Sequence, residues 1–134
     1  MITQIKPTVL VVDDSRTIRT LFTDLLSESG FDTMLARDGL EALEKLEQHR
    51  PDVVLLDIVM PRMNGYELCR KLRENPATRH IPIVMVSSKD QEFDRYWGLK
   101  QGADAYITRP CSPEEIVTTL RDLLNAKVEH ADSA

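Results

Sequence analysis

The sequence Val-Val-Leu-Leu-Asp occupies residues 53–57 and is an apolar run of four that ends at a carboxylate. Two further runs, 9–12 and 83–86, are also continuously apolar. A strand covered by helices on both faces has this composition, whereas a strand with one face in water alternates apolar and polar residues. The three runs therefore predict the interior strands of a parallel sheet.

Two more mixed runs, 32–36 and 105–108, complete a set of five, and amphipathic segments separate them. In these segments apolar residues recur every three or four positions, as in a helix with one buried face. The clearest stripes span 18–26, 40–46, 66–72 and 116–124, and the more polar segment 91–101 is also predicted to be helical. Five strand–helix repeats with short connections predict a doubly wound α/β sheet with right-handed crossovers.

One domain accounts for almost all of the 134 residues. Ser112 followed by Pro113 is a start signal for the last helix, and Gly30 is a stop signal for the first. We expect an N-terminal extension over 1–7, one domain over 8–126 and a disordered polar tail over 127–134, without a second domain or a linker.

Composition excludes several classes of function. The net charge of −5, with scattered Lys and Arg, argues against nucleic acid as a direct partner. No apolar run approaches the roughly 20 residues that span a bilayer, so membrane insertion is not expected, and residues 1–7 do not resemble a signal peptide. The two cysteines, Cys69 and Cys111, match no metal or redox spacing, which favours a reducing, cytoplasmic location.

Polar side chains gather where the predicted strands end. In an open α/β sheet, ligands bind at the carboxyl edge of the strands. That edge carries three carboxylates, a hydroxyl and a cation: Asp13, Asp14, Asp57, Ser87 and Arg109. Asp14 or Ser15 alone could simply cap a helix. Three carboxylates at one edge, however, repel one another unless a cation joins them.

This set of side chains suits phosphoryl transfer. Carboxylate oxygens with open positions are ligands for Mg²⁺. Phosphoryl transfer needs a nucleophile, a metal that neutralises oxygen charge and fixed donors on the remaining oxygens. Asp57 could serve as the nucleophile, with Ser87 and Arg109 as the donors.

The motifs taken together resemble the receiver domains of two-component response regulators over residues 8–125. The matching segments are 11–14 (VVDD), 55–61 (LLDIVMP), Asn64-Gly65, Ser87 and Arg109-Pro110. The resemblance implies a CheY-like (βα)5 fold of the flavodoxin type with strand order 2-1-3-4-5. It implies a stand-alone signalling protein rather than an enzyme.

The resemblance also implies the role of each site residue. Asp57 would accept a phosphoryl group from a histidine kinase or phosphotransfer domain. Mg²⁺ would be held by Asp13, Asp14 and Asp57, together with the backbone carbonyl of Val59. The cognate kinase and the output partner are not identified by the sequence.

The resemblance further implies a switch beside the acceptor. Ser87 would move toward the phosphoryl group, and Tyr106 would turn inward and alter the face formed by 91–101, 105–108 and the last helix, where a downstream protein would bind. The peptide bond between Arg109 and Pro110 would be cis. The alternative for Tyr106 is that it is a strand residue that simply packs against a neighbouring helix. Phe93 and Trp97 could contact a partner protein or could be ordinary residues of the hydrophobic core.

Three positions near the acceptor depart from the family or affect how long a signal lasts. The resemblance implies a Lys at position 109, where this chain has Arg109. The guanidinium of Arg is a planar group with several donors, whereas the ammonium of Lys is a compact charge. We therefore expect Asp57 still to be phosphorylated, but the phosphoryl group to be coupled differently to the conformational change. Val59 and Lys89 lie two residues beyond Asp57 and Ser87. Since Val cannot orient a water by hydrogen bonding, we expect slow self-dephosphorylation.

A narrower similarity lies in residues 88–103. That stretch resembles the single-domain regulators of type IV pilus systems, of the PilG and PilH type, which implies a role in chemotaxis-like or pilus-based motility.

Other functions were weighed against this one. A haloacid-dehalogenase-like phosphatase would need a second Asp at position 59, where Val59 stands. A phosphate-independent scaffold and a phosphate sink both stay open, and a redox switch through Cys69 and Cys111 is a third alternative, although Cys69 lies on an apolar helical stripe. A nucleotide-binding role lacks a glycine-rich phosphate loop.

Overall fold

The computed structural model describes residues 6–132. Most of the expected N-terminal extension, residues 1–5, and the last two residues lie outside this part of the chain. Five parallel strands form one sheet in the order β2-β1-β3-β4-β5, which confirms the predicted topology. The strands are β1 (Thr8–Val12), β2 (Asp32–Ala36), β3 (Val53–Leu56), β4 (Ile83–Ser87) and β5 (Ala105–Thr108).

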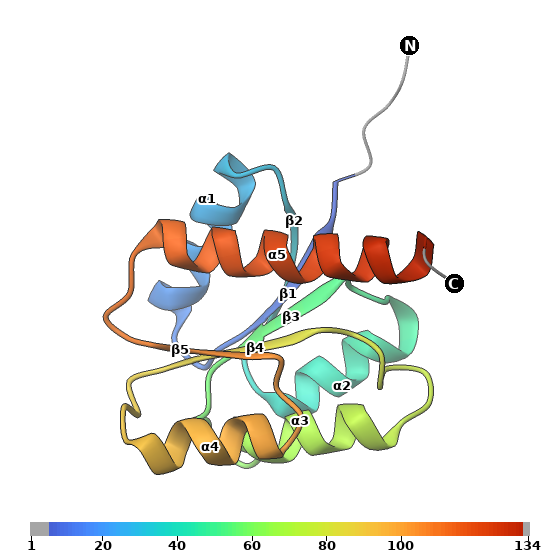
Figure 1. Ribbon diagram of the computed structural model, residues 1–134. Coiled ribbons are helices and arrows are strands. Elements are labelled where there is room, and N and C mark those ends of the chain that lie inside the picture. The colour runs from blue at the N-terminus through green and yellow to red at the C-terminus, as the bar shows by residue number, and fades with distance from the viewer. Residues whose placement is uncertain (1–5, 133–134) are drawn as a thin grey trace.

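Helices cover both faces of the sheet. They are α1 (Arg16–Glu28), α2 (Gly39–Gln48), α3 (Gly65–Glu74), α4 (Glu92–Lys100) and α5 (Pro113–Asp132). Helices α1 and α5 lie on one face, and α2, α3 and α4 lie on the other (Figure 1). The polar segment 91–101 is a helix, as expected.

The core has two halves because alternate side chains of each strand point to opposite faces. Leu10 and Val12 pack with the side chains of α2 and α3, whereas Val9 and Val11 pack with those of α1 and α5. All four residues of β3 are buried, as a strand between two helical layers requires.

The strand register brings the polar strand ends together. Val12 of β1 lies opposite Leu56 of β3, so Asp13 and Asp57 leave the sheet side by side. The amide of Asp57 donates to the carbonyl of Val12 at 3.0 Å. This pairing sets the distance between the two carboxylates before any side-chain contact is made.

Side-chain caps start the helices that border this edge. Ser15, Asp38 and Asn64 each accept a hydrogen bond from a backbone amide in the first turn of α1, α2 and α3. The hydroxyl of Ser112 accepts one from the amide of Glu115 at 3.1 Å, which confirms the predicted start of the last helix.

Helix α5 is longer than the sequence analysis predicted. It continues to Asp132, whereas residues 127–134 were expected to form a disordered tail. Residues 127–132 contain no Gly or Pro, so nothing in the local sequence ends the helix there. That prediction was wrong for residues 127–132.

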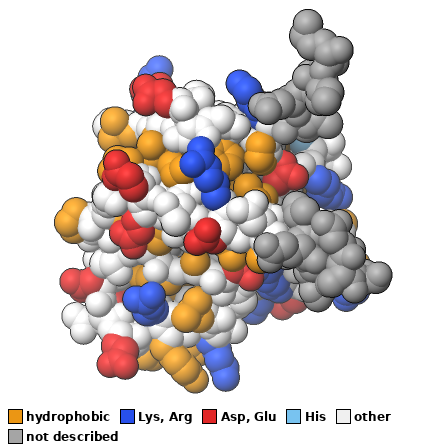
Figure 2. Space-filling model, turned by 45° about the horizontal axis from the view of Figure 1, so that its top comes forward, with side chains coloured by type: hydrophobic (Ala, Val, Ile, Leu, Met, Phe, Trp, Pro, Cys, Tyr) orange, Lys and Arg blue, Asp and Glu red, His pale blue; other side chains and the backbone are white. Residues whose placement is uncertain are grey.

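The outer surface carries charges of both signs. On the face that comes forward in Figure 2, acidic and basic side chains are interspersed with hydrophobic ones. Among residues 6–132, no helix has the length and apolar character needed to cross a membrane.

Candidate functional site

Three carboxylates converge at the carboxyl edge of the sheet. Asp13, Asp14 and Asp57 each offer an oxygen, and these oxygens lie within 4.8 Å of one another. The side chain of Asp13 is 3% exposed and that of Asp57 is 13% exposed, whereas Asp14 faces solvent. The three acids that the sequence placed on one edge therefore form a real cluster with one open side.

Backbone amides orient the two buried carboxylates. Oδ1 of Asp57 accepts from the amide of Ile58 at 2.7 Å, and Oδ1 of Asp13 accepts from the amide of Ser15 at 2.8 Å. The guanidinium of Arg19 donates to the backbone carbonyl of Asp13 at 2.6 Å and holds the turn that follows β1.

Arg109 supplies the positive charge of the cluster. Its Nη2 lies 3.3 Å from Asp13 Oδ2, 3.3 Å from Asp57 Oδ1 and 3.2 Å from the carbonyl oxygen of Val86. Its Nε is buried and finds no hydrogen-bond partner within the described part of the chain. The peptide bond that follows Arg109 is cis, as the resemblance implied.

Burial dominates the ionisation of the two carboxyls. Loss of solvent raises the pKa of Asp13 and that of Asp57 above the ordinary value of 3.8. The charge of Arg109 opposes this effect for Asp57, and the amide of Ser15 opposes it for Asp13. The protein therefore offsets only part of the negative charge of the ionised carboxylates, and a bound divalent cation would offset the rest.

The two predicted switch residues lie beside this cluster. Ser87 is fully buried, and its Oγ accepts from the amide of Lys89 at 3.2 Å. The Tyr106 ring is 5% exposed, and its hydroxyl donates to the carbonyl of Lys89 at 2.7 Å. Burial raises the pKa of Tyr106 to about 12, so the phenol stays a neutral donor. Tyr106 thus lies inward, bonded to the segment that follows Ser87.

Sequence reasoning missed what holds the loop after Asp57. A Cβ at Gly65 would lie 2.3 Å from the carbonyl oxygen of Asp57, so only glycine lets α3 begin this close to Asp57. Arg62 has a left-handed backbone (φ 67°) and pairs with Asp38 at the start of α2. The Asn64-Gly65 motif hinted at Gly65, but no local pattern links Arg62 to a residue 24 positions earlier.

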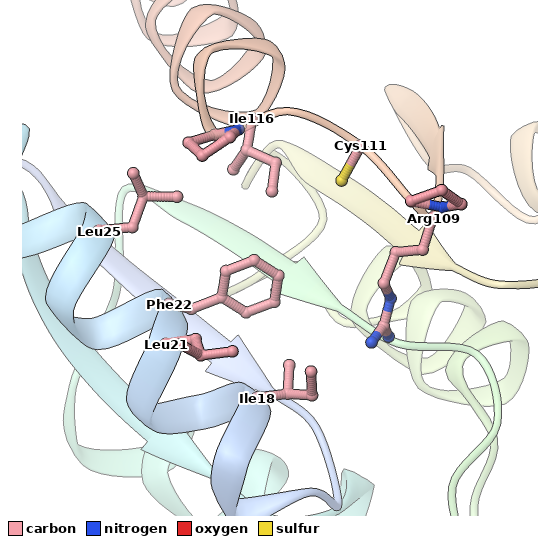
Figure 3. A pocket seen from close by; sticks show the side chains of 9 residues that line it. Ile18, Leu21, Phe22, Leu25, Arg109, Cys111 and Ile116 are labelled. Atoms are coloured by element: carbon pink, nitrogen blue, oxygen red, sulfur yellow. The ribbon is translucent and has the colours of Figure 1, made fainter.

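An apolar groove lies next to the cluster. It has a volume of about 340 Å³ between α1 and the β5–α5 connection, and Arg109 lines it together with Ile18, Leu21, Phe22, Leu25, Pro110, Cys111, Pro113 and Ile116. Phe22 projects into the space between α1 and Cys111, with Arg109 at one end (Figure 3). The groove therefore shares Arg109 with the acidic cluster.

The two cysteines have different surroundings. Both are free thiols; Cys69 is buried and Cys111 is partly exposed. Burial raises the pKa of Cys69 to about 11, and burial also raises the pKa of Cys111. Since the thiolate is the reactive form, neither environment favours thiol chemistry.

Comparison with known proteins decides the family. The profile of the response regulator receiver domain matches residues 9–121, most of the chain. This chain belongs to the response regulator receiver family. The cluster of Asp13, Asp14 and Asp57 is thus the acidic pocket of a receiver domain.

Two relatives from Pseudomonas aeruginosa match over most of their length. Protein PilG is 41% identical over 113 residues, which cover 84% of this chain and 84% of PilG. Protein PilH is 40% identical over 116 residues, which cover 87% of this chain and 96% of PilH. Other relatives are longer: the chain spans about half the length of PhoP of Bacillus subtilis, to which it is 43% identical.

Solved receiver structures share the fold. The chemotaxis protein CheY4 of Vibrio cholerae superposes with a TM-score of 0.83 at 32% identity, over 88% of this chain and 98% of CheY4. The receiver domain of the sensor histidine kinase PA1611 of P. aeruginosa has a TM-score of 0.83 at 26% identity, over 90% of this chain and 99% of that one. Its structure contains a magnesium ion coordinated in the active site cleft.

The donor set of this chain fits Mg²⁺. The cluster offers only carboxylate oxygens, which are hard ligands, and contains neither thiolate nor imidazole. Arg109 contacts two of the three carboxylates, and the third, that of Asp14, is exposed to solvent.

We expect Asp57→Asn to stabilise the metal-free protein at neutral pH. The variant removes one buried charge, while Asn can still accept from the amide of Ile58 and Arg109 keeps Asp13 as its partner. A gain of about 1 kcal/mol would raise Tm by roughly 3–5 °C in a domain of this size. Thermal unfolding in EDTA measures this difference.

The pH dependence has a definite sign. Because the folded pKa of Asp57 lies above its ordinary 3.8, the folded state prefers the protonated carboxyl. The advantage of Asp57→Asn should therefore be small below pH 3.8 and grow as the pH rises through the folded pKa. Added Mg²⁺ should raise the Tm of the wild type more than that of the variant. A lower Tm for Asp57→Asn in EDTA would contradict the argument.

Proposed function

We propose that this chain accepts a phosphoryl group on Asp57 from a histidine kinase or phosphotransfer domain and relays the signal through a protein-binding surface. The observation that carries the proposal is the contact of one guanidinium with both Asp13 and Asp57, beside the open carboxylate of Asp14. A nucleophile, a metal-binding set and a fixed cation thus share one site.

The arrangement supports transfer in a single displacement. A carboxylate oxygen of Asp57 attacks the phosphorus, the bond from phosphorus to the donor nitrogen breaks, and the donor imidazole leaves with that electron pair. The amide of Ile58 holds Oδ1 of Asp57, which leaves Oδ2 for the attack. Bound Mg²⁺ would neutralise charge on the phosphoryl oxygens; Asp13, Asp14, Asp57 and the carbonyl of Val59 would hold it.

Arg109 and Ser87 would stabilise the product. The guanidinium already lies 3.3 Å from Asp57, and its buried Nε is an unused donor for a phosphoryl oxygen. The hydroxyl of Ser87 lies at the end of β4 and can donate to a second oxygen. The product is an acyl phosphate in which charged oxygens meet donors fixed by the sheet.

The signal would leave through the face formed by α4, β5 and α5. Ser87 and Tyr106 lie beneath it, and both touch the segment that leads into α4 through Lys89. On α4 the rings of Phe93 and Trp97 stack with centroids 6.2 Å apart, and Phe93 is 68% exposed. Exposed aromatic side chains of this kind are suited to anchor a downstream protein.

The cellular role we propose is control of motility. The similarity to PilG and PilH over nearly the full length of both relatives supports a chemotaxis-like or type IV pilus pathway. We further propose a cytoplasmic location, no direct contact with nucleic acid and no enzymatic activity other than acceptance and slow loss of its own phosphoryl group.

A phosphate-independent scaffold or phosphate sink is the second candidate. The observation that favours the scaffold is the position of Arg109, which holds Asp13 and Asp57 together without a metal or phosphate.

We expect the purified protein to gain one phosphoryl group when it is incubated with acetyl phosphate and Mg²⁺. The gain should require Mg²⁺, because the clustered carboxylates would otherwise repel the donor. It should be absent in Asp57→Asn. Intact-mass analysis measures the change, and Asp24→Asn on the exposed face of α1 is a matched control that should still be labelled. Absence of labelling with acetyl phosphate and with a cognate kinase would favour the scaffold.

We expect Arg109→Lys to keep phosphorylation but to change its effect on conformation. Nη2 of Arg109 contacts Asp13, Asp57 and the carbonyl of Val86 at once, whereas an ammonium is a compact charge on a flexible stem. The emission of Trp97, the single tryptophan, should therefore respond differently to acetyl phosphate in the two proteins. Equal responses at equal labelling would remove this idea.

We expect slow self-dephosphorylation that Val59→Asn accelerates. Val59 is 55% exposed and cannot orient water, whereas an amide at this position can. An effect of about 1.4 kcal/mol on the barrier would shorten the half-life about tenfold. The decay of the phosphorylated mass measures it, with Val59→Ala as the control that should match the wild type. Rapid loss from the wild type would contradict the expectation.

A further inference from the structure

Position 98 of α4 has no side chain, and the space where one would lie is already filled. A Cβ at Gly98 would be 2.9 Å from Sδ of Met85 and 3.0 Å from Cδ2 of Tyr106. Gly98 is also the buried residue of α4. Glycine is unfavourable in a helix interior, so its presence here points to a packing requirement.

Two side chains fill this space, that of Met85 and that of Tyr106, and Tyr106 is the one that belongs to the proposed switch. Its ring is 5% exposed, and its hydroxyl donates to the carbonyl of Lys89 just before α4. Helix α4 is held over the same region by Tyr66, whose hydroxyl donates to the carbonyl of Asp94 at 3.3 Å. The Tyr106 ring is therefore enclosed by β4, by the segment after Ser87 and by α4 at Gly98.

We propose that Gly98 is a positioning residue: it forms a notch in α4 that receives the Tyr106 ring and keeps it buried when Asp57 carries no phosphoryl group. With any larger residue at position 98, the Met85 side chain, the Tyr106 ring or α4 has to move, because a β-carbon cannot lie 2.9–3.0 Å from two neighbours. The notch itself needs no phosphate; its meaning for signalling rests on the proposed function.

The notch sets the resting state of the proposed switch. A ligand shifts a two-state equilibrium only by its differential affinity for the two states. Because the inward state of Tyr106 is already favoured here, a phosphoryl group on Asp57 needs only a small difference in affinity between the inward and outward states to complete the transition. Gly98 thus gives this chain a low threshold for switching.

The test is ¹⁹F NMR of the full chain labelled with 3-fluorotyrosine. The protein has three tyrosines, Tyr66, Tyr96 and Tyr106, which Tyr→Phe variants assign. The shift between H₂O and D₂O reports exposure. In the wild type, Tyr106 should be shielded, unlike Tyr96, which is 59% exposed. In Gly98→Ala the exposed population of Tyr106 should rise at least about tenfold, whereas Lys100→Ala on the same helix should leave it unchanged.

Two results would overturn the proposal: an exposed Tyr106 in the wild type, or a Tyr106 that stays buried in Gly98→Ala. If Gly98→Ala fails to fold, the same substitution in a Tyr106→Leu background decides the question. The smaller side chain removes the contact with the ring and leaves the contact with Met85, so Gly98→Ala should lower Tm less there than in the wild type. An equal loss in both backgrounds would refute the notch.

These spectra are recorded without Mg²⁺ or phosphodonor. Failure of the notch therefore appears in the tyrosine resonances, whereas failure of the proposed function appears as absent labelling in the mass measurement. Each can fail without the other.

Discussion

The pairing of β1 with β3 is the constraint on which the site depends. Val12 lies opposite Leu56, and the residue that follows each of these strands carries a carboxylate. The buried sheet thereby forces Asp13 and Asp57 together although like charges repel. Arg109, which follows β5, reaches across to both and partly offsets that cost. The negative charge that Arg109 does not offset favours the binding of a divalent cation at this site.

Rigid and adjustable parts divide along the sheet. The acidic cluster is fixed by backbone amides at Ile58 and Ser15 and by the close start of α3 at Gly65. On the other side, Ser87 and Tyr106 both bond to the backbone of Lys89, just before α4, and Tyr106 also packs against α4 at Gly98. The hydroxyls of both residues are therefore linked through Lys89 to the segment that leads into α4.

The departure of this chain from the family lies in its cation. A lysine would place one compact charge between the carboxylates, whereas Arg109 contacts Asp13, Asp57 and the carbonyl of Val86 and still has an unused Nε. Arg109 also lines the groove beside α1, so one side chain contacts Asp57 and borders the neighbouring apolar surface.

The sequence by itself determined the five strands, the doubly wound fold and the members of the acidic cluster. Apolar runs and helical stripes are encoded within a few residues, and strand ends such as Asp57 follow directly from them. Only the tertiary structure decided the pairing of Arg62 with Asp38, the notch at Gly98 and the inward position of Tyr106. Each of these three features joins residues of different strands, helices or loops, and no local pattern carries that information.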